Sequence, residues 1–180
     1  RTGHIVNEIS SLPPAVTGLR LHALLLRLLK QYNVDLIEQS TITGSVIENG
    51  HCSALITTNN GQERRYEARS FIIATGGVLS EGFAIEPERA WEPIFDIDLP
   101  LNPEWSMPEA YPPCRQTPGT PRPSHGFALL GPDVDNKLRP LGKDGNPLCD
   151  NVFFIGKTLG GYDHAAEKSG NGVALATAFF

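Results

Sequence analysis

The chain has 180 residues and a net charge of −5 at pH 7, and no cluster of lysine or arginine stands out along it. This length allows a real hydrophobic core, in one domain or in two small ones. The acidic balance argues against a nucleic-acid surface. No apolar run approaches the roughly 20 residues that a membrane-spanning helix needs.

The three cysteines, Cys52, Cys114 and Cys149, lie far apart and form no CxxC pair or cysteine–histidine cluster. The sequence therefore predicts no metal site, neither zinc nor iron–sulfur. Unpaired thiols indicate a reducing cytoplasm. The chain starts at Arg1 without an initiator methionine or a signal peptide, and it stops inside a helical pattern, so we expect it to be part of a longer polypeptide.

The first predicted element is an amphipathic helix over residues 19–31, where leucines fall on one face and basic residues flank them. Paired prolines forbid a helix just before it, and Thr17 is a suitable N-cap. A short strand is expected over 34–37.

Residues 41–48 and 52–58 are β-prone and are joined by Asn49-Gly50, the commonest pair in tight hairpin turns. A turn at 59–61 and a third run at 64–68 complete a predicted antiparallel β-meander. The apolar run that follows stops abruptly at Thr75-Gly76-Gly77, and such an ending brings backbone close to a neighbour or a ligand.

Residues 80–125 hold many of the 15 prolines and both tryptophans without a sustained period. We expect an irregular but ordered Pro-rich cap there. Short strands are expected at 126–130 and 136–140, with a turn at 142–147. The predicted organisation is therefore residues 1–79 with helix and meander, the cap at 80–125, and residues 126–180 with the final strand and helix.

The last thirty residues carry the strongest local signal. Residues 152–155 predict a buried strand ending at Gly156, and 173–180 predict a helix of small residues. A strand, a glycine loop and a helix in this order aim free backbone N–H groups at an anion. The alternative is a tight turn between packed elements, but four glycines around Tyr162-Asp163-His164 favour a ligand site.

Separated stretches resemble glutathione-reductase-like flavoproteins, including the fumarate reductase group. In these proteins an ATGG strand and a late strand, glycine loop and helix line the flavin, as in residues 70–77 (SFIIATGG) and 151–178 (NVFFIG…GGYDHAAEKSGNGVALATA). Four further stretches resemble segments of the B subunit of anaerobic glycerol-3-phosphate dehydrogenase, in the same order: 12–22 (LPPAVTGLRLH), 91–99 (WEPIFDIDL), 135–140 (DNKLRP) and 156–163 (GKTLGGYD). The resemblance implies an α/β, flavoprotein-like fragment.

The chain departs from this family in three respects. The family's cysteine- and glycine-rich loop before the last helix is Lys168-Ser-Gly170-Asn-Gly172 here. The family's GxGxxG loop, which receives the cofactor's phosphates, has no match in residues 1–180. The Asp-Pro that usually follows Gly-Gly-Tyr/Phe is Asp163-His164 here. We therefore expect the flavin-facing and substrate-facing part of a longer protein, with FMN or FAD as cofactor and weak or no flavin binding by this part alone.

The resemblance implies cofactor contacts at the glycine turns and at the last helix. A flavin that accepts a hydride gains negative charge near N1 and O2, where a helix N-terminus offers backbone donors. The expected cofactor-binding residues are Thr75, Gly76, Gly77, Gly156, Gly160, Gly161, Gly170, Asn171, Gly172 and Val173. Tight strand–loop or helix–strand packing is the alternative for all of them.

Oxidation of a secondary alcohol needs a base for the hydroxyl proton. His164 is the first candidate, with Asp163 as its orienting partner. Arginine suits the phosphate of a substrate, and the family match points to Arg139 and Arg20. Each arginine is alternatively solvated or salt-bridged.

The implied function is that of a quinone-linked flavoprotein subunit of anaerobic respiration, which oxidises glycerol 3-phosphate to dihydroxyacetone phosphate. Its expected partners are the small-molecule substrate and the catalytic and iron–sulfur subunits of one complex. We expect it in the cytoplasm, peripheral on the inner membrane through those partners. Two alternatives stay open: a non-catalytic docking subunit, and a fumarate-reductase-like dehydrogenase of another substrate.

Overall fold

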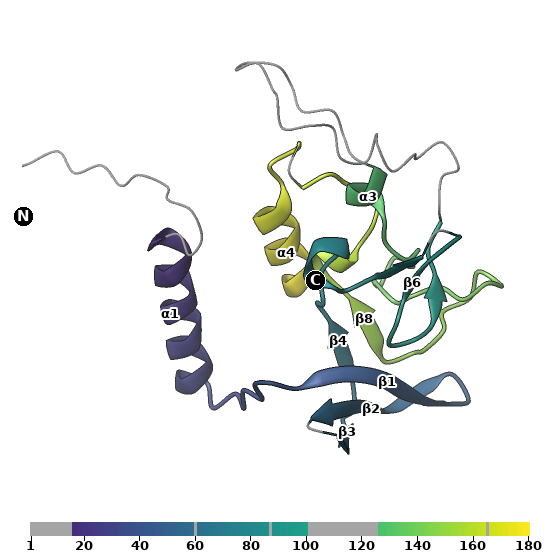
Figure 1. Cartoon of the computed structure of the whole chain (residues 1–180), viewed down its shortest axis with the longest axis horizontal. Helices are drawn as coiled ribbons and strands as arrows, with labels where there is room; N and C mark the ends of the chain where they lie inside the picture. The colour runs from purple at the N-terminus through teal and green to yellow at the C-terminus, as the bar shows by residue number, and fades with distance from the viewer. Residues whose placement is uncertain (1–15, 60, 87, 101–125, 165) are drawn as a thin grey trace, which may run out of the picture. The chain divides into compact units, whose positions relative to one another are not determined.

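A computed structural model of the chain describes residues 16–59, 61–86, 88–100, 126–164 and 166–180. The chain divides into two compact units, Arg1–Ser40 and Thr41–Phe180. The first unit contains α1 (Val16–Gln31), drawn in purple in Figure 1. The predicted helix is confirmed, but it begins at Val16, so Thr17 lies within it and is not the N-cap. Residues 34–37 form no strand.

The predicted meander is confirmed in the second unit. It consists of β1 (Thr41–Glu48), β2 (His51–Asn59) and β3 (Gln62–Glu67), which pair antiparallel in chain order. Asn49 and Gly50 have φ of 51° and 75°, and two positive φ values are what a two-residue hairpin turn requires.

Two short strands that are distant in sequence form a parallel pair. These are β4 (Phe71–Ile73) and β8 (Val152–Phe154), with Phe71 opposite Val152 and Ile73 opposite Phe154. These four side chains are buried in the main core, where the ring of Phe154 lies 5.9 Å from that of Phe95. Because the strands run in the same direction, their carboxyl ends meet at one edge.

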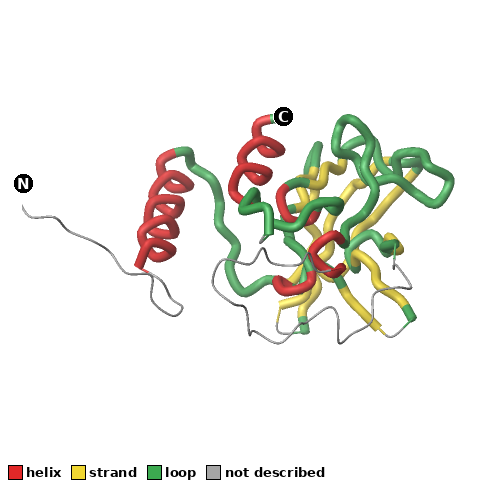
Figure 2. The backbone as a smooth tube through the Cα atoms, turned by 90° about the horizontal axis from the view of Figure 1, so that it is seen from above, coloured by secondary structure: helices red, strands yellow, loops and turns green. Residues whose placement is uncertain are grey.

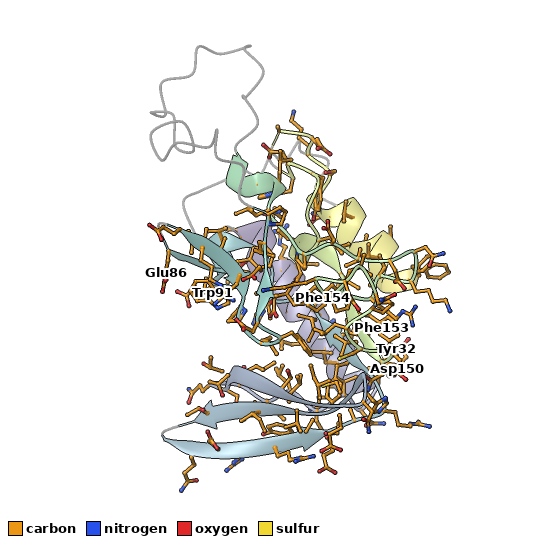
Figure 3. The ribbon with its side chains drawn as sticks, turned by 90° about the vertical axis from the view of Figure 1, so that its right-hand side faces the viewer. Tyr32, Glu86, Trp91, Asp150, Phe153 and Phe154 are labelled. Atoms are coloured by element: carbon orange, nitrogen blue, oxygen red, sulfur yellow. The ribbon has the colours of Figure 1, made fainter. Side chains whose placement is uncertain are left out.

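The other face of this pair is open. Successive side chains of a strand point to opposite faces, so Phe153 points away from the core that buries Phe154 (Figure 3). On the same face, Ile72 is 64% exposed. An apolar groove lined by Ile72, Phe153, Ile155 and Phe180 lies there. Apolar side chains therefore lie on both faces of this strand pair, and the chain buries only one of the two faces.

Part of the segment expected to be an irregular cap forms a second antiparallel sheet. Its strands are β5 (Ala84–Glu86), β6 (Arg89–Glu92) and β7 (Ile97–Asp98). Arg89 ties two of them together: it donates to Asp98 at 2.8 Å and to Asp96 at 2.6 Å, and it lies over the ring of Trp91. Strands of two to four residues are too short to show alternation in the sequence. Residues 101–125 of the predicted cap lie outside the described residues.

The segment after the predicted cap, residues 126–180, also differs locally from the sequence-based prediction. Residues 126–130 form the short helix α3 (Gly126–Leu129) instead of a strand. Residues 130–151 are mostly loop (green in Figure 2), with single bridges at Val134–Pro140 and Leu141–Pro147. The turn at 142–147 is confirmed. The chain ends with the 3-10 turn η2 (Gly156–Thr158) and α4 (Gly170–Phe179).

The turn after β6 is built on a buried carboxylate. Glu92 is 0% exposed, and it accepts hydrogen bonds from the backbone N–H groups of Ile94 at 3.1 Å and Phe95 at 2.8 Å. Burial raises the pKa of Glu92 to about 7, against the effect of these two donors.

This shift makes stability depend on pH. The folded protein binds the Glu92 proton more tightly than the unfolded chain does, so stability from this group is full below pH ~4.5 and is lost as pH rises to about 7. The loss is about 3 kcal/mol at ~1.4 kcal/mol per pKa unit. Urea unfolding at pH 5 and pH 8 measures it. Glu92→Gln should weaken the pH dependence of the free energy of unfolding. An unchanged pH dependence in the variant would contradict its assignment to Glu92.

Candidate functional site

The carboxyl ends of β4 and β8 lead into two turns that touch. The turn Thr75–Gly77 follows β4 and η2 follows β8. The backbone N–H of Gly76 donates to Thr158 Oγ1 at 3.0 Å, and Thr158 is fully buried. Two loops about 80 residues apart in sequence are thereby fixed side by side, as the sequence-based hypothesis required.

The glycines at this edge divide into two groups. Some are explained by packing: a Cβ on Gly160 would lie 2.9 Å from the backbone nitrogen of Gly131, and a Cβ on Gly76 would clash with the side chain of Ser80. For these, tight packing is sufficient explanation. By contrast, added Cβ atoms on Gly161 and Gly172 would meet nothing within 4 Å. These two border open space, where a ligand has room.

Helix α4 stands over the end of β8 (Figure 1). The N–H of Gly156 donates to Thr177 Oγ1 at 3.0 Å, and Gly156 faces Ala174. The helix begins at Gly170, three residues before the predicted start, and Ser169 forms no side-chain cap. Asn171 and Gly172 are exposed, so the first turn presents uncapped backbone donors at the site edge.

The proposed catalytic pair is arranged differently from the sequence expectation. The buried carboxylate of Asp163 accepts the N–H of Ala166 at 3.0 Å, and the N–H of Asp163 donates to Glu167 at 2.9 Å. Asp163 thus shapes the 163–167 turn. His164 Nδ1 is buried and has no hydrogen-bond partner among the residues that the structure describes, so Asp163 does not orient His164 through that atom.

Only one of the two predicted phosphate-binding arginines, Arg139, lies in the unit that carries the strand ends. Arg139 donates twice to Asp135, at 2.8 and 2.6 Å, and its guanidinium is thereby engaged in the turn before β8. Arg20 lies on α1 in the other unit and has interactions of its own.

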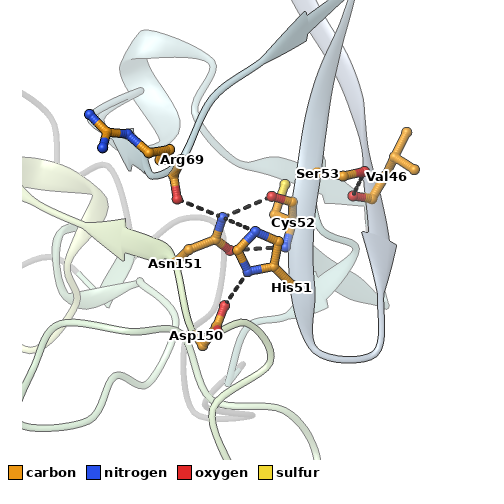
Figure 4. Close-up of polar contacts among 7 residues, drawn as sticks. All are labelled: Val46, His51, Cys52, Ser53, Arg69, Asp150 and Asn151. Atoms are coloured by element: carbon orange, nitrogen blue, oxygen red, sulfur yellow. Dashed lines mark hydrogen bonds and ion pairs between the residues drawn. The ribbon is translucent and has the colours of Figure 1, made fainter.

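The start of β8 is fixed by a residue that the sequence did not single out. The side chain of Asn151 accepts the N–H of Cys52 at 2.9 Å and donates to the carbonyls of Cys52 at 2.8 Å and Arg69 at 3.2 Å (Figure 4). At the exposed rim, Asp150 bonds His51 at 2.7 Å. This network joins β2, the lead-in to β4 and β8, and a polar residue just before an apolar strand was its only signal.

Residues 2–93 match the FAD binding domain family model, a span that includes β4 and the Thr75–Gly77 turn. The chain belongs to the FAD-binding domain family. This agrees with the predicted choice of FMN or FAD and names FAD. It also confirms the predicted flavoprotein-like α/β class.

Curated relatives of this FAD-binding domain protein give a second comparison. The chain is 30% identical over 182 residues to the B subunit of anaerobic glycerol-3-phosphate dehydrogenase of Vibrio vulnificus (strain CMCP6), covering 99% of this chain and 39% of that protein. It is 29% identical over 180 residues to the probable B subunit of the same enzyme in Halobacterium salinarum (strain ATCC 29341 / DSM 671 / R1), covering 98% and 40%. The resemblance seen in the sequence is confirmed.

The chain spans about two fifths of the length of these curated relatives. No solved structure matches it. Among the described residues, no helix combines the length and apolarity needed to cross a membrane, and no group of three or more His, Cys, Asp or Glu could hold a metal ion.

The residues at the strand ends fit FAD in chemical type. Thr75 Oγ1, Tyr162 Oη and His164 Nδ1 are buried polar atoms without a hydrogen-bond partner in the described part of the chain. Such atoms are costly unless a ligand or water satisfies them. These three atoms give this edge unused hydrogen-bonding capacity, and the open space at Gly161 and Gly172 leaves room for a ligand.

Proposed function

We propose that the full-length protein is a flavin-dependent oxidoreductase that oxidises glycerol 3-phosphate to dihydroxyacetone phosphate. One observation carries the proposal: in a chain of the FAD-binding domain family, the ends of two parallel strands form touching glycine turns, and α4 packs against the second of them. Ligands of open α/β sheets bind at the carboxyl ends of strands. We infer the substrate from the names of the curated relatives.

FAD, when bound, supplies the hydride acceptor. The free backbone N–H groups at the start of α4, from Gly170 to Gly172, would offer donors to the part of the flavin that gains negative charge, and the helix dipole would add about 0.3–1 kcal/mol or somewhat more when buried. The N–H of Val173 already donates to the carbonyl of Ser169 at 2.9 Å, so Val173 would contribute only through the helix dipole. The glycine turns at Thr75–Gly77 and Gly156–Gly161 would hold the rest of the cofactor.

His164 receives the alcohol proton. With the ring proton on Nε2, the buried Nδ1, which has no partner among the described residues, has a lone pair for the substrate hydroxyl. Asp163 supports this role indirectly, because its hydrogen bond to Ala166 fixes the turn that carries His164.

The names of the relatives describe a subunit, and this supports partners in one complex. In our proposal, electrons pass from the flavin to quinone through a separate iron–sulfur subunit, beside a catalytic subunit. The complex is cytoplasmic and peripheral on the inner membrane. The three-part organisation at 1–79, 80–125 and 126–180 stays a prediction.

Anaerobic titration of the purified full-length protein tests this function. The flavin absorbance should be bleached by glycerol 3-phosphate and not by succinate. Bleaching by succinate alone would instead favour a fumarate-reductase-like dehydrogenase. A colourless protein that takes up no FAD would favour a non-catalytic docking subunit and contradict the oxidoreductase assignment.

A further inference from the structure

Lys157 lies where the two strand ends meet. It is the middle residue of η2, directly after β8. A Cβ placed on Gly77 would be 3.5 Å from Cε of Lys157 and 3.8 Å from its Nζ. The aliphatic stem of Lys157 therefore runs along the turn that ends β4, and its ammonium group belongs to the edge where the proposed cofactor binds.

The ammonium group of Lys157 is only partly used. Its Nζ donates to the carbonyl of Ala128 at 2.6 Å and lies 5.0 Å from the centroid of the Tyr162 ring. An ammonium has three donors, and none of the ion pairs found among the described residues involves Lys157. Burial lowers the pKa of Lys157, while the charge of Asp163 opposes that shift. A half-buried cation in this position is stabilised by an anion.

A second donor lies on the same loop. The hydroxyl of Tyr162 is buried without a hydrogen-bond partner in the described chain, and the ring that bears it lies under the cation of Lys157. Burial raises the pKa of Tyr162, so its hydroxyl keeps its proton at neutral pH and can donate. The arginine that sequence reasoning favoured for a phosphate, Arg139, is already paired with Asp135.

We propose that Lys157, assisted by the hydroxyl of Tyr162, binds a phosphate group of a ligand at this site. The inference rests on the proposed function and deepens it, because it transfers the phosphate-binding role from Arg139 and Arg20 to η2. Two sources carry this chemistry: the pyrophosphate of FAD and the phosphate of glycerol 3-phosphate. The ammonium group of Lys157 can bind either phosphate as a point charge. A charge-assisted hydrogen bond of this kind is stronger than one between neutral groups.

The test compares Lys157→Met with Lys143→Met in the full-length protein. Lys143 is a matched control because its side chain is 86% exposed and pairs with Asp98 in a different turn. One arm measures the Kd of the apoprotein for FAD and for riboflavin, which lacks phosphate. The other arm measures KM for glycerol 3-phosphate and for glycerol.

Loss of the charge should weaken the phosphate-bearing ligand about 10- to 100-fold. A selective loss for FAD over riboflavin assigns the cofactor pyrophosphate, and a selective rise in KM for glycerol 3-phosphate over glycerol assigns the substrate. Lys157→Arg, which keeps the charge, should remain within a few-fold of the wild type. Lys143→Met should change neither arm.

Equal losses for ligands with and without phosphate, or no change in either arm, would overturn the inference. If methionine at position 157 prevents folding, Tyr162→Phe carries the same comparison with removal of one oxygen. Failure of the proposed function is distinct: in that case the wild-type protein itself does not bind FAD, or is not reduced by glycerol 3-phosphate.

Discussion

Gly131→Ala should destabilise the protein by about 3 to 5 kcal/mol, the upper range for overpacking. The added Cβ would lie 2.1 Å from the backbone nitrogen of Gly160 and 2.6 Å from the carbonyl carbon of Leu159. Both contacts are to backbone, which cannot move aside by changing a rotamer. The two segments must separate, and the hydrogen bond from Gly161 N–H to the carbonyl of Leu129, now 2.9 Å, is lost with them.

Urea unfolding of the full-length protein measures this effect. Gly44→Ala is the control, because a Cβ on Gly44 would meet nothing within 4 Å, and alanine is favoured over glycine inside a strand by roughly 0.5–1 kcal/mol. FAD affinity should also fall in Gly131→Ala, since the displaced backbone carries Gly161. A Gly131→Ala protein as stable as the wild type would show that the backbones of Gly131 and Gly160 are packed less closely than described.

Asn151→Ala should destabilise the protein by about 3 kcal/mol, because it leaves two buried backbone groups and one half-buried backbone group without partners. These are the N–H and carbonyl of Cys52 and the carbonyl of Arg69, all now bonded to the Asn151 side chain. Asn151→Asp should be no better. A carboxylate keeps the acceptor for Cys52 N–H but offers no donor to either carbonyl, and it adds a buried charge.

His51→Ala is the matched control for this network. His51 also touches Asn151 and pairs with Asp150, but its side chain is half-exposed, so its removal should cost less than about 1 kcal/mol. Urea unfolding midpoints of the three variants rank these effects. If His51→Ala cost as much as Asn151→Ala, the stability would reside in the exposed hydrogen bond between His51 and Asp150 and not in the buried amide.

Local chemistry made much of the fold predictable. Asn49-Gly50 specifies a hairpin turn by its backbone preferences alone. The apolar runs ending at Thr75-Gly76-Gly77 and at Gly156 identified two strands, of which the structure buries one face, and their parallel pairing placed both glycine turns at one edge. The short apolar run at 126–130 was wrong as a strand, because periodicity cannot separate a short strand from a short helix.

What the sequence could not provide were contacts between distant residues. Asn151 bonds Cys52 across 99 positions, and its place just before an apolar strand does not reveal that partner. Lys157 lies against Gly77 only because two parallel strands end together. The pairing of Arg139 with Asp135 spans only four residues, so the sequence spacing could have predicted it. The family match instead suggested a phosphate-binding role for Arg139.

The most direct test of the central claim is FAD binding by Gly172→Leu, with Gly18→Leu in α1 as control. A Cβ on either glycine would meet nothing within 4 Å, so the described fold accepts both changes, and leaving glycine stabilises a helix by up to about 1 kcal/mol. If the start of α4 faces the flavin ring, apo Gly172→Leu should unfold at the wild-type urea concentration or higher and bind FAD at least about tenfold more weakly. Wild-type FAD affinity in a fully stable Gly172→Leu protein would contradict the placement of flavin at the ends of β4 and β8.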